Sequence, residues 1–170
     1  MSIGIDLERF GLLQAVVDKD NYKSSVSRFQ EENILLPTFE ELADPTKIPN
    51  SVNEALKQID PNDAHPLNLF RVHWYNEYGA RGTVDVPQHI VLPPELTGVE
   101  AKIVLAYGNR FPMITAHKVL AAYSCFVPRV ISGQFNPTHH RAIWPSTGNF
   151  ARGGIAISTL MRSRGVAVLP

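Results

Sequence analysis

Apolar residues at helical spacing open the chain. Four of them follow Asp6, which has the position of an N-cap: Leu7, Phe10, Leu13 and Val17. This spacing predicts a helix with one apolar stripe. Further short helices follow, and we interpret residues 1–64 as a helical N-terminal extension.

Two capping boxes and several prolines set the expected bounds of those short helices. Thr38 with Glu41, and Ser51 with Glu54, have the spacing of a capping box, so each pair predicts a helix start. Each helix is limited to a few turns by the prolines around it: Pro37, Pro45, Pro49 and Pro61.

Residues 65–98 change from helical to alternating character. Phe70, Val72 and Trp74 alternate with more polar neighbours, which predicts a half-buried strand. A glycine-bearing turn and several prolines follow. We interpret residues 65–98 as a linker or an edge segment of a sheet.

From residue 99 onward the pattern alternates between strands and helices. The expected order is a strand at 101–107, a helix at 115–126 stopped by Pro128, a short strand at 127–131, a strand at 142–144, a helix at 150–164 ended by Gly165, and a strand at 166–169. Such alternation is typical of a parallel sheet covered by helices. The expected fold is α/β: a partial three-layer, open, mostly parallel sheet with flanking helices, preceded by the helical N-terminal arm. Because Pro170 comes directly after a strand, we expect residues 99–170 to be the start of a domain that is truncated or split.

Charge is unevenly distributed between the two parts of the chain. All 16 acidic side chains lie within residues 1–100, whereas half of the 16 Lys and Arg side chains lie within residues 101–170. The second part should attract anions. Three partners fit this charge: phosphate or carboxylate ligands, nucleic acid, or the acidic part of the same molecule.

Several classes of protein are disfavoured. No apolar run approaches the ~20 residues that cross a membrane, and the first residues lack the order of a signal peptide, so we expect a cytoplasmic protein without membrane contact. Cys125 is the only cysteine, which excludes an internal disulfide and favours a small buried side chain. The arginines are scattered among apolar runs and do not form a patch, so we expect no nucleic-acid binding.

Three histidines could suggest a metal site. His139 and His140 are adjacent, and His117 lies upstream, but adjacent side chains point in different directions and no carboxylate follows Glu100. We therefore expect no metal.

A polar turn separates a predicted strand from a predicted helix near the C-terminus. In an open α/β sheet, ligands bind at the carboxyl ends of strands, where helix N-termini point their free N–H groups. Ser146, Thr147, Gly148 and Asn149 occupy that position. They predict a ligand-binding turn, and an ordinary turn and helix cap is the alternative.

Lys118 lies in an otherwise apolar helical stretch. A lysine that loses solvation favours its neutral amine, which can form a Schiff base. A lysine on an exposed face is the alternative. Arg110 and Arg141, near the predicted strand ends, are further candidates for anion binding.

Residues 101–170 resemble the start of the catalytic region of fold-type II pyridoxal-phosphate enzymes, the superfamily of cysteine synthase, tryptophan synthase β chain and threonine synthase. The resemblance rests on four features: the strand before Gly108-Asn109, Lys118, Pro145-Ser146-Thr147-Gly148-Asn149 with its glycine-bearing helix, and residues 165–170.

The resemblance implies a role for each site residue. Lys118 would form the Schiff base with pyridoxal 5'-phosphate and transfer protons. Ser146, Thr147 and Gly148 would bind the substrate carboxylate, and Asn149 would contact the ring hydroxyl of the cofactor. The phosphate-binding loop of this family lies farther downstream than Pro170, so the resemblance implies half of an active site.

The expected function is thus the N-terminal part of a cysteine synthase-like lyase or transferase, which catalyses elimination or β-replacement on an amino acid. The chain would form a homo-oligomer or pair with a chain that supplies the C-terminal half. The alternative is a noncatalytic interaction subunit, or a remnant, that keeps the fold and pairs with another chain.

Overall fold

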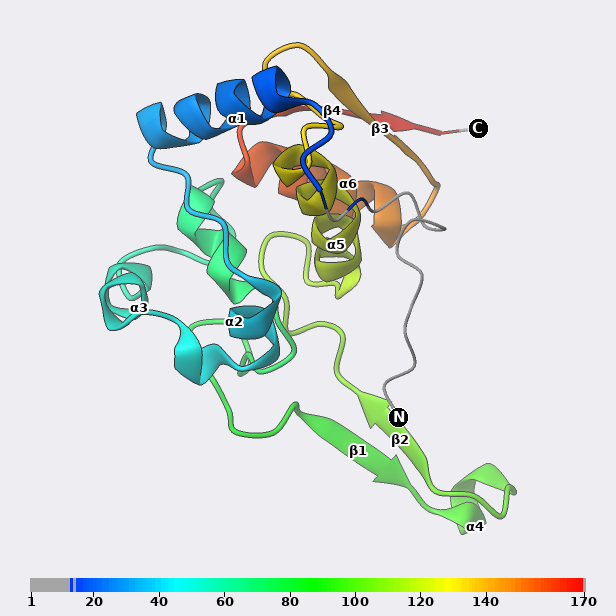
Figure 1. Ribbon diagram of the computed structural model, residues 1–170. Helices are drawn as coiled ribbons and strands as arrows, with labels where there is room; N and C mark the ends of the chain where they lie inside the picture. Colours follow the sequence, from blue (N-terminus) through cyan, green and yellow to red (C-terminus); the bar gives the residue numbers. More distant parts are fainter. Residues whose placement is uncertain (1–12, 14, 170) are drawn as a thin grey trace.

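A computed structural model describes residues 13 and 15–169 (Figure 1). The elements, in chain order, are α1 (Lys19–Glu31), α2 (Phe39–Ala43), η2 (Pro45–Lys47), α3 (Asn50–Leu56), η3 (Pro66–Arg71), β1 (His89–Leu92), α4 (Pro94–Thr97), β2 (Ile103–Ala106), α5 (Lys118–Ile131), β3 (Arg141–Pro145), α6 (Asn149–Leu160) and β4 (Arg164–Val168). The helix predicted after Asp6 falls mainly outside the described residues. None of the described elements is a helix long and apolar enough to span a bilayer.

One of the two predicted capping boxes is confirmed. The Thr38 N–H donates to the Glu41 carboxylate over 2.7 Å, and the Glu41 N–H donates to Thr38 Oγ1 over 3.1 Å. The box predicted at Ser51 is wrong, because the N-cap residue of α3 is Pro49 and the helix has no side-chain cap; Ser51 lies inside the helix, which begins at Asn50. The ring of Pro49 fixes its own φ, so the chain enters the helix directly from the proline.

A βαβ unit forms the C-terminal part of the fold. β3 and β4 pair in parallel with Ile143 opposite Val166, and α6 connects them. This part of the expected topology is confirmed. The helix ends at Leu160 and not at Gly165, because Arg162 takes the left-handed conformation with φ 47° and Gly165 lies within β4.

The strand predicted at 101–107 does not join that sheet. β2 pairs antiparallel with β1, with Val104 opposite Val91, and the hairpin projects from the body with α4 at its tip (Figure 1). The expectation of a buried parallel strand is wrong, since Val104 is 54% exposed. The described residues form an α/β protein with two separate two-stranded sheets.

α5 runs through the proline that was expected to stop it. Pro128 lies in its last turn, and Val127 and Val130 on either side are buried. A proline inside a helix costs about 3 kcal/mol, and burying two valines offsets a cost of that size at about 1.5–3 kcal/mol each. The strand predicted at 127–131 is therefore wrong.

The helices of the N-terminal extension share a core with the βαβ unit. Phe29 of α1 and Leu42 of α2 lie in one buried cluster with side chains from α5 and α6. Tyr123 of α5 joins α5 to the N-terminal part, because its hydroxyl donates to the Pro37 carbonyl over 2.6 Å.

Two further expectations fail. The strand predicted across Phe70, Val72 and Trp74 is wrong, because η3 and a turn occupy this segment. Arg71 and His73 are as buried as Val72, so the alternation did not separate an inner face from an outer one. Cys125 is exposed on α5 and not buried as expected.

Candidate functional site

The turn before α6 leaves the helix N-terminus open to a ligand. Gly148 is the N-cap residue and has no side chain to cap the helix, and the Ser146 hydroxyl accepts the Gly148 N–H over 3.1 Å. Across the described residues, the N–H groups of Asn149, Phe150 and Ala151 have no hydrogen-bond acceptor. Such N–H groups, together with the helix dipole, favour an anion.

A cavity of about 530 Å³ lies beside this turn. Its walls come from the turn, one face of α6, the segment before α5 and the end of β4: Met113, Ile114, Ser146, Thr147, Gly148, Ala151, Arg152, Ile155, Ala156, Thr159, Ala167 and Leu169. The lining is mostly apolar and includes a few polar side chains, as in most small-molecule sites. The structure thus brings Ser146, Thr147 and Gly148 to one cavity.

Lys118 lies near this cavity without lining it. It is the first residue of α5, where the sequence placed it one turn into a helix, and it is half-buried. An added Cβ on Gly153 of α6 would lie 2.5 Å from the Lys118 carbonyl oxygen, so the two backbones are in close contact.

The segment before α5 contains two residues in the left-handed region. Met113 has φ 67° and Thr115 has φ 49°. This conformation is unfavourable for a β-branched residue such as threonine, and strain of this kind concentrates at functional sites. The strained segment therefore begins in the cavity wall, at Met113, and precedes Lys118 in the chain.

Asn149 lies beside the turn and not among the residues that line the cavity. Its Oδ1 accepts a hydrogen bond from Arg152 Nη1 over 2.9 Å, and the side chain is exposed. Since Oδ1 accepts this bond, the Nδ2 group is the donor that remains for a ligand.

Arg152 is a candidate site residue that the sequence interpretation did not single out. It lines the cavity from the first turn of α6, and its Nη2 lies 3.5 Å from the Ile114 carbonyl oxygen. A cation in the first turn opposes the helix dipole at a cost of about 0.3–1 kcal/mol. That unfavourable position was the signal available in the sequence.

The two arginines that were singled out as anion-binding candidates lie elsewhere. Arg110 is held over the rings of Tyr78 and Tyr107, 4.9 and 4.8 Å from their centroids. Arg141 begins β3, at the end of the strand opposite the turn.

Replacing Arg152 with glutamine should separate stability from binding. We expect the free energy of unfolding to stay within about 0.5 kcal/mol, because the lost hydrogen bonds are exposed and the helix dipole is better matched. Affinity for a carboxylate ligand of the cavity should fall on the order of tenfold, as for one charge-assisted hydrogen bond. Denaturant unfolding and ligand titration of both proteins check this. Equal affinity in the two proteins would contradict it.

The histidines serve local structure. The His140 ring accepts the Asn136 N–H over 3.0 Å and contacts Phe135, while His117 stacks on Trp74 with a centroid distance of 5.4 Å. Within the described residues there is no cluster of three or more His, Cys, Asp or Glu side chains that could hold a metal ion.

The site can therefore bind an oxyanion at the α6 N-terminus and an apolar or planar group against α6. A small-molecule ligand fits the cavity, whose volume lies within the usual range of about 300–1,000 Å³. The lysine amine and the N–H groups suit a carbonyl-bearing cofactor and a carboxylate substrate, respectively. Comparison with protein-family models, with curated proteins and with solved structures finds no match for this chain.

Proposed function

We propose that this chain supplies part of the active site of a pyridoxal-phosphate-dependent enzyme that acts on an amino acid by elimination or β-replacement. One observation carries the proposal. The uncapped N-terminus of α6 opens on a cavity, and the backbone of Lys118 contacts the same helix at Gly153. A Schiff-base amine and a carboxylate-binding turn need this proximity.

Lys118 is the proposed covalent anchor and proton-transfer group. Its amine would condense with the cofactor aldehyde, with loss of water, and would later move a proton at the substrate α-carbon. When bound, pyridoxal phosphate supplies an electron sink for the α-carbanion. Lys118 is half-buried in the first turn of α5.

The turn is the proposed binding site for the substrate carboxylate. The Ser146 and Thr147 hydroxyls and the free N–H groups of α6 would donate to its oxygens, and the Arg152 guanidinium adds a positive charge. Asn149 Nδ2 is the proposed donor to the ring oxygen of the cofactor. The carboxylate would thus orient the substrate α-carbon toward Lys118.

The larger sheet, the partner chain and the cellular location expected from the sequence belong to the same proposal. The β3–α6–β4 unit would extend into a larger, three-layer open sheet through homo-oligomerisation or pairing with a chain that carries the phosphate-binding half. The cytoplasm is the proposed location, which fits the single cysteine. The second candidate function is a noncatalytic subunit, which the exposed apolar residues of the β1–β2 hairpin favour.

Titration with pyridoxal phosphate tests the proposal. We expect a saturable absorbance band of a protonated Schiff base in the native protein and its loss in Lys118→Ala. Lys102→Ala is the matched control, because Lys102 is an exposed lysine next to β2 and should leave the band unchanged. A band of equal strength in Lys118→Ala would refute the assignment and leave the subunit function as the better account.

A further inference from the structure

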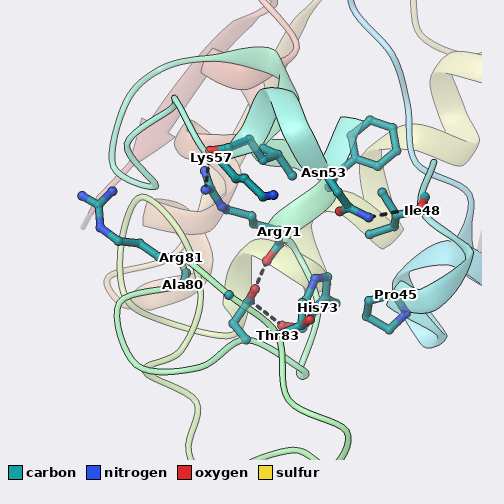
Figure 2. A pocket seen from close by; sticks show the side chains of 13 residues that line it. Pro45, Ile48, Asn53, Lys57, Arg71, His73, Ala80, Arg81 and Thr83 are labelled. Carbon is teal, nitrogen blue, oxygen red and sulfur yellow. Dashed lines mark hydrogen bonds between the residues drawn. The ribbon is translucent and has the colours of Figure 1, made fainter. Parts of the chain in front are cut away.

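A second cavity, of about 200 Å³, lies in the N-terminal half of the molecule, apart from the residues of the proposed active site (Figure 2). Its lining comes from η2, α3, η3 and the turn at residues 80–83: Pro45, Ile48, Asn53, Leu56, Lys57, Phe70, Arg71, His73, Asn76, Ala80, Arg81, Gly82 and Thr83. The lining includes three cationic side chains and no carboxylate.

Arg71 brings a buried positive charge to this cavity. It is only 4% exposed, and no carboxylate within the described residues forms an ion pair with it. Its Nη atoms donate to the Ile59 and Leu56 carbonyls and to Asn68 Oδ1, over 3.0, 2.9 and 2.6 Å. These three acceptors are neutral. Asp60 acts on the Arg71 charge from a distance, but its carboxylate pairs with Arg81. Burial of a charge without a directly paired carboxylate is costly, so the cavity favours an anion beside Arg71.

Two N–H groups of that guanidinium remain available, since a guanidinium has five and three are used. One of them is Nε–H. In the described part of the chain, the only side-chain nitrogen or oxygen that is both sealed from solvent and unpaired is Nε of Arg28, so Nε of Arg71 is accessible, on a residue that lines the cavity. Nε and Nη2 form one edge of the guanidinium, an edge that binds the two oxygens of an oxyanion.

His73 presents a second donor. It is 1% exposed, and its Nδ1 accepts the Tyr75 N–H over 3.2 Å. Burial and the charge of Arg71 lower the pKa of His73 to about 4, so the ring is neutral at pH 7 and carries its proton on Nε2. Nε2 has no partner in the described residues and is accessible to solvent, and His73 lines the same cavity.

The side chain of Asn76 holds the residues that carry these donors in place. Asn76 Nδ2 donates to the carbonyls of Arg71 and His73 over 2.7 and 2.9 Å, so both residues are fixed by one amide. Lys57 and Arg81 lie at the rim, where exposed Glu54 and Asp60 already pair with them. The free positive potential of the cavity therefore comes from Arg71.

We propose that this cavity is a binding site for a small oxyanion, a carboxylate or phosphate group held by Arg71 and His73. The volume is below the range of about 300–1,000 Å³ that suits drug-sized ligands, so the occupant is a small anion or the anionic end of a longer molecule. Carboxylate and phosphate share the chemistry that the donors recognise, and the titration distinguishes them.

The test uses the whole chain at pH 7.5 and constant ionic strength. Inorganic phosphate, acetate and, as control, chloride are titrated while the Nε2–H resonance of His73 is followed by NMR. We expect a saturable shift with phosphate or acetate and none with chloride. The anion that binds more tightly, phosphate or acetate, identifies the group that the site prefers. The absence of a saturable shift with both, or an equal shift with chloride, would overturn the proposal.

Three variants show where the anion binds. Thr83→Tyr fills the exposed mouth without touching the hydrogen bonds of Arg71, and we expect affinity to fall on the order of tenfold or more. His73→Leu should lower the affinity to a similar extent, read from the change in Tm with phosphate. Lys57→Gln is the rim control and should change the affinity less than about threefold, because an exposed ion pair is weak. Undiminished binding in Thr83→Tyr would overturn the proposal.

Discussion

Replacing Gly153 with alanine is expected to destabilise the protein by about 2 kcal/mol. In an ordinary helix the change would stabilise by about 1 kcal/mol. Here the new Cβ would lie 2.5 Å from the Lys118 carbonyl oxygen and 2.7 Å from its carbonyl carbon, so α5 and α6 must separate. Overpacking of this kind costs about 1–3 kcal/mol or more, and backbone atoms cannot rotate away. Denaturant unfolding measures the change.

Gly148→Ala is the control for Gly153→Ala, because Gly148 is the N-cap residue of the same helix, α6. A Cβ on Gly148 would meet nothing closer than Ser146 Oγ at 3.9 Å, and its φ of −111° suits any residue. Gly148→Ala should change the free energy of unfolding by less than about 0.5 kcal/mol. Gly153→Ala should also weaken pyridoxal-phosphate binding, because it displaces Lys118. A stabilised Gly153→Ala protein would show that the α5–α6 contact is looser than described.

Acid should destabilise the protein through His73. Its pKa is about 4 in the folded protein, against an ordinary value of 6.5, because burial and the Arg71 charge disfavour the protonated ring. The unfolded state therefore binds more protons between these values, so stability is complete above pH 6.5 and falls as the pH drops toward 4. The loss should approach about 3 kcal/mol, from about 1.4 kcal/mol per pKa unit.

Unfolding free energies at several pH values between 7.5 and 4 measure this loss. His73→Gln cannot titrate, so it should be less stable than the native protein at neutral pH but should lack the decline between pH 6.5 and 4. Identical slopes in the two proteins would contradict the role of His73.

The βαβ unit was predictable because its signals are local. Ala142 and Trp144 read as a strand, the turn at 146–149 reads as a helix start, and residues 166–168 read as the next strand. A helix between two short apolar strands has few alternatives to a parallel crossover. The Ser-Thr-Gly turn at the cavity follows from that topology, since it must lie at the carboxyl end of β3.

The hairpin and α5 were not predictable in the same way. The apolar run at 101–107 has the composition of a buried parallel strand, yet an antiparallel neighbour at His89–Leu92 is only a short loop away. Pairing between strands that are close in sequence is favoured because closing a short loop has a small entropic cost. α5 continues past Pro128 because Val127 and Val130 reach the core, a tertiary effect that propensity cannot show.

The cavity residues outside the turn also escaped prediction. Met113 and Arg152 line one cavity only because the segment before α5 folds against α6. Ile114 and Arg152, which make a hydrogen bond between these two segments, are 38 residues apart in the sequence. Arg71 and His73 appeared to be the polar face of a strand. Their burial depends on two asparagines: Asn68 Oδ1 accepts a hydrogen bond from Arg71 Nη1, and Asn76 Nδ2 donates to the carbonyls of Arg71 and His73.

The most direct measurement of the central claim is the identity of the lysine that pyridoxal phosphate modifies. The protein is mixed with the cofactor, reduced with borohydride to fix the Schiff base as a secondary amine, and digested for peptide mapping by mass spectrometry. The proposed site predicts that the label lies on Lys118, that a carboxylate amino acid lowers the labelling in competition, and that Arg152→Gln weakens this competition. A label spread over the exposed lysines, with Lys118 unmodified, would contradict the proposed active site.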